Sequence, residues 1–232
     1  MEYLNLNKAI ARLIILQRVE LQSFWIRKLR KIFGRYIFTN FFSRFFIAET
    51  KINQKYYSRM NEEYKNLNNT INFDGKKILS IEPVMVALEL IINTRSKNTF
   101  FTIIEKNYVS KKIVYGWDIQ NKEGYNDLNL LKVFLENNGM KNNCEIYDFD
   151  NDDLPFKKFD YVLSLYSLDY HYDFSFYQEY LKKVCTENTK IIFDTIRPEY
   201  FNKIFKNVQV LFSQEKKIHS SKRIICDNFL VG

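Results

Sequence analysis

The chain has 232 residues and a formal net charge of +8, and apolar side chains make up 46% of it. That length and composition are typical of a globular chain with a full hydrophobic core, and they exclude a disordered one. The three cysteines are scattered and there are only two histidines, which argues against a disulfide framework or a multi-histidine metal site. We therefore expect free thiols, no metal site and a cytoplasmic location.

The positive charge belongs to one part of the chain. Residues 1–60 contain 12 Lys or Arg and 3 Asp or Glu, a net of +9, whereas residues 61–232 contain 23 and 24, a net of −1. No run of eighteen uncharged apolar residues predicts a membrane-spanning helix. The first apolar stretch is interrupted by Arg18 and Glu20, unlike a signal peptide.

The basic part is predicted to be helical. Residues 4–47 show apolar side chains at helical spacing, and residues 48–70 predict a second helix that ends in an Asn-rich turn. Residues 24–38, "FWIRKLRKIFGRYIF", are both basic and aromatic. That combination fits peripheral contact with an anionic membrane, and it equally fits packing on the main domain or on a second copy in a homodimer. No motif predicts a specific nucleic-acid partner.

From residue 76 onward, strand patterns alternate with helix patterns. Strands are predicted at 76–82, 99–105, 144–149, 159–168 and 190–196, helices at 85–95, 125–139, 176–185 and 198–207, and a final strand pair at 208–213 and 222–229. This alternation predicts an α/β fold with a doubly wound, mostly parallel sheet over residues 71–232, preceded by a helical extension over 1–70. Ligands of such sheets bind outside the carboxyl ends of the strands.

Three segments in this order resemble the class I S-adenosylmethionine-dependent methyltransferases, over about residues 74–232. They are "ILSIEPVMVALEL" at 78–90, "TFFTIIEKN" at 99–107 and "EIYDFDNDDLPFKKFDYVLSLYSLDYH" at 145–171. The resemblance implies the Rossmann-like methyltransferase fold, S-adenosylmethionine as cofactor and a small-molecule acceptor.

The first segment departs from the family in its cofactor loop. Ser80 stands where the family has an acid, and Glu82, Val84 and Val86 stand at the three glycine positions, with Pro83 between them. Glycine there permits close approach of the backbone and unusual φ/ψ angles. A β-branched Val does not readily adopt a positive φ, so we expect the loop to take another path. Either Glu82 then pairs with the α-amino group of the cofactor, or the loop is closed and the site is lost.

The resemblance also implies residues for the nucleoside. Glu105 ends the second strand, where a carboxylate would accept hydrogen bonds from the ribose hydroxyls, and Asp118 is a competing choice for that role. Asp148 would accept from the adenine amino group, and Phe149 and Leu165 would sandwich the ring.

Catalytic candidates follow the fourth strand. Asp169 and His171 lie there, and a neutral His can take the proton of an acceptor hydroxyl. The sequence thus favours methylation of a small-molecule or sugar hydroxyl, with bacterial surface-glycan synthesis as a fold-level analogy. The alternative is a catalytically inactive methyltransferase fold that serves as a binding or structural partner.

Overall fold

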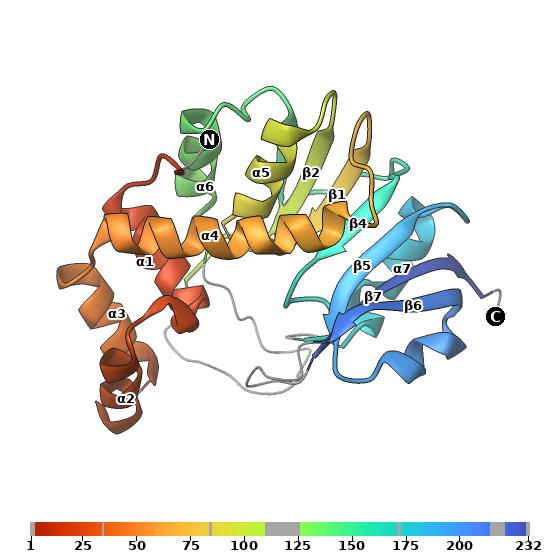
Figure 1. The fold of residues 1–232 in the computed structure, drawn as a ribbon. Coiled ribbons are helices and arrows are strands. Elements are labelled where there is room, and N and C mark those ends of the chain that lie inside the picture. Colours follow the sequence, from red (N-terminus) through yellow and green to blue (C-terminus); the bar gives the residue numbers. More distant parts are fainter. Residues whose placement is uncertain are drawn as a thin grey trace.

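A seven-stranded sheet forms the centre of the protein, in the strand order β3-β2-β1-β4-β5-β7-β6 (Figure 1). The structure is a computed structural model that describes residues 3–33, 35–83, 85–109, 126–170, 173–213 and 221–230. The strands are β1 (Lys77–Ile81), β2 (Phe100–Glu105), β3 (Cys144–Asp148), β4 (Tyr161–Ser164), β5 (Lys190–Thr195), β6 (Phe205–Ser213) and β7 (Lys222–Phe229). Strands β1 to β5 pair in parallel, and β7 lies antiparallel between β5 and β6, which confirms the predicted fold class.

Helices cover both faces of the sheet. They are α1 (Lys8–Gln17), η1 (Val19–Leu21), α2 (Phe24–Phe33), α3 (Arg35–Phe45), α4 (Glu49–Asn68), α5 (Ala87–Arg95), α6 (Leu128–Asn137), α7 (Ser175–Val184) and the 3-10 helix η2 (Pro198–Lys203). Of the described helices, none is long and apolar enough to cross a bilayer.

Alternation along the strands explains the two layers of helices. In β1, Ile78 packs in one core with α1, α4, α5 and α6, whereas its neighbour Leu79 packs in a second core with α7 and η2. Successive residues of a strand point to opposite faces, so a strand that is apolar throughout needs cover on both sides.

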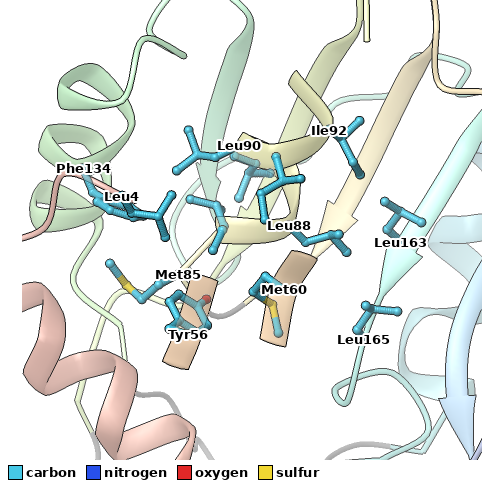
Figure 2. Packing of buried hydrophobic residues seen from close by; sticks show 14 of the residues in the cluster. Leu4, Tyr56, Met60, Met85, Leu88, Leu90, Ile92, Phe134, Leu163 and Leu165 are labelled. Carbon is cyan, nitrogen blue, oxygen red and sulfur yellow. The ribbon is translucent and has the colours of Figure 1, made fainter. Parts of the chain in front are cut away.

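The N-terminal helices share the first of these cores. Figure 1 shows α4 crossing in front of α5, and Figure 2 shows Tyr56 and Met60 of α4 facing Met85 and Leu88. All four side chains are buried. The helices before residue 70 are therefore joined to the sheet by apolar packing.

Two predicted elements were wrong. Residues 4–47 are not one helix: α1 ends where Arg18 leaves the helical conformation, and the Ser23 hydroxyl accepts from the Ile26 N–H at the start of α2. The helix predicted at 198–207 is a 3-10 turn followed by β6. Phe205 begins that strand because its ring packs on Phe174 and Phe229, which overrides the local helical pattern.

Candidate active site

The carboxyl ends of the central parallel strands bring three buried acids to one edge of the sheet. Glu82 directly follows β1, Glu105 ends β2 and Asp148 ends β3. Glu105 and Asp148 are register partners, and the Glu82 N–H donates to the carbonyl of Ile104. These three acids, which the sequence predicted for a ligand, are therefore neighbours in space. We call Glu82, Glu105 and Asp148 the acidic edge.

The loop after β1 keeps left-handed backbone at two of the glycine positions. Glu82 has φ 48° and Val86 has φ 41°. The expectation that valine would force the loop onto another path was wrong for Val86. Its side chain is fully buried and its carbonyl accepts from the Leu90 N–H, so packing and the first bond of α5 hold a conformation that costs a β-branched residue about 1–3 kcal/mol. Pro83 is half-buried, and Val84 lies outside the described residues.

The Glu82 carboxylate ties this loop to the segment after β4 and to α7. Ser167 Oγ donates to Oε2 at 2.5 Å and Tyr177 Oη donates to Oε1 at 2.6 Å. Burial raises the pKa of Glu82, and the positive charge of Lys106 opposes that rise. Each carboxylate oxygen thus already accepts a hydrogen bond from a protein hydroxyl.

The two other acids are anchored by nearby donors. Glu105 Oε1 accepts from the Lys106 N–H at 2.9 Å. The oxygens of Asp148 accept from the Asp150 N–H at 3.1 Å and from Asn151 Nδ2 at 2.8 Å. A carboxylate has about four lone-pair positions, so Asp148 retains capacity for a further donor. The competing acid, Asp118, lies outside the described residues.

The predicted ring sandwich is not assembled. Phe149 packs on the rings of Phe176 and Tyr177, at 5.4 Å and 5.3 Å between centroids, in the core covered by α7. Leu165 is buried in the other core, beside α4. The two side chains therefore lie in different cores, and only Phe149 adjoins the acidic edge.

Asp169 is held in an ion pair. It is buried at φ 58°, accepts from Thr195 Oγ1 at 2.6 Å and lies 2.5 Å from Arg197 Nη2, which also contacts Asp173 at 2.7 Å. Hydrogen bonding to Asp169 raises the pKa of Arg197. Asp169 and Asp173 thus meet at one guanidinium, while His171 lies outside the described residues.

The structure reveals an acid that the sequence reading missed. Ser80 Oγ donates to Glu89 Oε1 of α5 at 2.5 Å. Glu89 is 2% exposed, and burial raises its pKa to about 7, opposed by that hydrogen bond. Its Oε2 has no hydrogen-bond partner among the described residues. Glu89 therefore brings a buried carboxyl group to Ser80, the position at which the resemblance implies an acid.

A buried phenol lies near Glu89. Burial raises the pKa of Tyr56, and backbone hydrogen bonds from Met85 and Ala87 oppose that rise. The guanidinium of Arg18 lies 4.7 Å from the centroid of the Tyr166 ring, and its charge lowers the pKa of both Glu89 and Tyr56 against the larger effect of burial. We call Arg18, Tyr56, Ser80 and Glu89 the Glu89 cluster.

A second buried group of charges lies between α4 and the sheet. Arg223 of β7 is fully buried, donates to Glu63 at 2.5 Å and pairs with Asp194 at 3.1 and 2.9 Å, while Arg59 contacts Glu63 at 2.8 Å. Burial opposes ionisation of Glu63, but Arg223 and Arg59 outweigh it and lower its pKa. We call these four residues the Arg223 network.

The similarity of this chain to known proteins lies in its structure. No family model matches the chain, and no curated protein matches it. The pyocyanin biosynthetic protein PhzM superposes with a TM-score of 0.54 at 9% identity, covering 97% of this chain and 74% of PhzM. A candidate O-methyltransferase of Nostoc punctiforme gives 0.52 at 12% identity, covering 74% of this chain and 56% of that protein.

The chain has the Rossmann-like methyltransferase fold. The mitomycin 7-O-methyltransferase MmcR gives a TM-score of 0.50 at 11% identity, covering 95% of this chain and 67% of MmcR. This chain thus spans little more than half the length of the Nostoc protein and about two thirds of MmcR. Within the methyltransferase fold of this chain, the acidic edge and the Glu89 cluster are the places to look for chemistry.

Proposed function

We propose that this protein is an S-adenosylmethionine-dependent methyltransferase that acts on a hydroxyl of a small molecule or sugar. One observation carries the proposal: a buried carboxyl oxygen, Glu89 Oε2, has no partner among the described residues and adjoins the end of β1 in a methyltransferase fold. A buried polar atom without a partner costs about 1–3 kcal/mol. Such atoms in a native protein therefore call for a ligand or water.

The Glu89 cluster fits the amino-acid end of this cofactor. An ammonium group can donate to Glu89 Oε2, and a carboxylate can accept from Tyr56 Oη and pair with Arg18. The unpartnered Glu89 oxygen would then be satisfied. The cluster combines an acid, a cation and a hydroxyl, which is the chemistry that a zwitterionic α-amino acid requires.

The acidic edge fits the nucleoside end. Glu105 would accept from the ribose hydroxyls and Asp148 from the adenine amino group, with Phe149 beside the ring. When bound, the cofactor supplies an electrophilic methyl group on a positively charged sulfur. The carboxylates of this edge favour that positive charge. The chain's own contribution is to bind the cofactor, to orient it and to exclude water from the site.

We assign the acceptor to the region beyond β4 and β5, around Asp169 and Arg197. Methyl transfer to a hydroxyl releases one proton, for which His171 is the proposed base. The Asp169–Arg197–Asp173 contacts would position the segment that carries His171. A bacterial surface glycan is the acceptor that we propose by analogy of fold alone.

The hydrogen bonds of the Glu82 carboxylate favour a second candidate. Ser167 and Tyr177 hold both oxygens within the protein, so fewer lone pairs remain for an incoming ammonium group than the sequence led us to expect. If the loop after β1 is closed in this way, the protein is an inactive methyltransferase fold that serves as a partner subunit.

Thermal denaturation with S-adenosylmethionine and with its demethylated product separates the two candidates. A ligand at 100 times its Kd adds about 2.7 kcal/mol to the free energy of unfolding. We expect such a stabilisation in the wild type, its loss in Glu105→Ala, and its retention in the control Glu136→Ala, a substitution in the exposed part of α6. No stabilisation at millimolar cofactor would favour the inactive partner.

A further inference from the structure

Helix α2 carries its large apolar side chains on the outside. None of its residues is buried. Trp25 is 69% exposed, Ile32 70% and Phe33 66%, and Phe24 and Leu29 are also exposed. At 100° per residue, Trp25, Leu29, Ile32 and Phe33 fall on one side of the helix. These four residues are called the α2 face.

The basic residues of α2 lie outside the α2 face. Arg27, Lys28, Arg30 and Lys31 occupy the remaining arc of the helix, and Arg27 and Arg30 are half-buried. A surface helix normally turns its apolar stripe inward and its charges outward. In this helix the apolar α2 face is exposed, the least exposed arc holds Ile26, Arg27 and Arg30, and the exposed Lys28 and Lys31 lie between the two.

Helix α3 continues the exposed apolar surface. Phe41 and Phe45 of α3, and Phe46 directly after it, are each more than half exposed. Figure 1 shows α2 and α3 projecting together at the lower left, away from the sheet. Their aromatic rings meet where Phe33 stacks on Phe38 at 5.8 Å. An exposed apolar surface made by two helices marks a place that something else covers.

Charge decides which partner suits this surface. No Asp or Glu lies between Glu20 and Glu49, and residues 21–48 contain six Lys or Arg. Two copies of the chain would bring these cations against each other. A nucleic acid would use the cations but leave the apolar face in water. An anionic bilayer satisfies both, because its headgroups attract the cations and its acyl boundary accepts Trp and Phe.

We infer that α2, together with the exposed aromatic residues of α3, docks on the surface of an anionic lipid bilayer. The α2 face enters the headgroup boundary. The exposed Lys28, next to Ile32 on the helix, contacts the lipid headgroups from the flank of this face, and the exposed Lys31 lies further round the helix and adds its charge. This surface lies outside the proposed active site, so the inference does not depend on the proposed function.

Vesicle flotation tests the inference on the full chain. We expect binding to phosphatidylcholine vesicles that contain phosphatidylglycerol and little binding to phosphatidylcholine alone. Trp25→Glu combined with Ile32→Glu should abolish binding, and Lys28→Glu with Lys31→Glu should weaken it by about tenfold or more. The matched control is Phe156→Glu, since Phe156 is as exposed as Ile32 at 70% but lies elsewhere on the fold.

Fluorescence and sedimentation complete the test. In a Trp117→Phe background Trp25 is the sole tryptophan, and its emission should shift to the blue with anionic vesicles. Because α2 contributes no buried residue, its variants should keep the wild-type circular dichroism and Tm. Equal binding to both vesicle types, or unchanged binding of the Trp25→Glu and Ile32→Glu variant, would overturn the inference. So would a wild-type dimer that this variant converts to monomers, which would assign the surface to self-association.

Discussion

Helix α4 contacts two buried groups of charges, and the two differ in how their carboxyl groups are compensated for the loss of water. In the Arg223 network, the carboxylates of Glu63 and Asp194 both meet guanidinium groups. In the Glu89 cluster, Glu89 Oε2 has no partner in the described residues. The side chain of Arg59 is 25% exposed, but the carboxyl groups of Glu63, Asp194 and Glu89 are all buried, so exposure of the acids does not explain the difference.

The contrast lies in how each buried charge is compensated. Burial of an ion is tolerated when partners compensate for lost water, as they do around Arg223. Around Glu89, one carboxyl oxygen has no such partner among the described residues. We therefore interpret the Arg223 network as a structural link between α4 and the sheet, and the Glu89 cluster as part of the cofactor site that we propose.

The largest effect is expected from breaking the Arg223 network. Arg223→Met would leave Glu63 and Asp194 buried with less compensation, and removal of one partner of a buried pair typically costs 3–5 kcal/mol. We expect a loss of about that size in the free energy of unfolding measured by urea denaturation. The neighbouring variant Lys222→Met, at a partly exposed position, should change stability by less than about 0.5 kcal/mol. Equal losses of stability in Arg223→Met and Lys222→Met would contradict a stabilising role for the Arg223 network.

Removal of the charged group from the Glu89 cluster should raise the stability of the protein, whereas removal of Arg223 should lower it. Glu89 has an ordinary pKa of 4.5 when unfolded and about 7 in the folded protein. The folded state keeps the proton to higher pH, so this residue lowers stability as pH rises from 4.5 through 7, by about 3 kcal/mol in total. Glu89→Gln should remove this loss and be more stable than wild type above pH 7. Urea midpoints at several pH values measure it, and parallel pH profiles for the two proteins would contradict it.

The smallest predicted effect concerns the start of the helix that carries Glu89. Val86→Ala and Val86→Gly both delete the buried isopropyl group, but only alanine keeps a Cβ at φ 41°. We expect the glycine variant to be the more stable of the two by about 1 kcal/mol, because a left-handed conformation costs a non-glycine residue about that much. Thermal denaturation compares them directly. Equal stabilities would show that the loop relaxes once the side chain is gone.

Much of the fold could be predicted because its signals are local. Apolar strands such as Lys190–Thr195 and the Asp127 cap of α6 can be recognised within a few residues. The N-terminal helices were harder, since Arg18 and Ser23 are both tolerated inside helices and only the packing shows that they break one. Phe205 was misassigned because an aromatic residue suits a helix face and a strand equally well.

The site was predictable only where it follows strand ends. Glu82, Glu105 and Asp148 could be placed at one edge because parallel strands end together. Glu89 could not, since its meeting with Ser80 depends on how α5 rotates over β1. The Arg223–Glu63 contact joins residues that are 160 positions apart, and no periodicity in the sequence predicts it.

That separation has a consequence during biosynthesis. Glu63 leaves the ribosome 160 residues before Arg223, an interval of roughly 8–30 s at ordinary elongation rates. If α4 docks on the sheet within that interval, it buries Glu63 with Arg59 as its counter-ion and without Arg223. Complete compensation of this buried carboxylate therefore depends on the last hairpin of the chain to be synthesised.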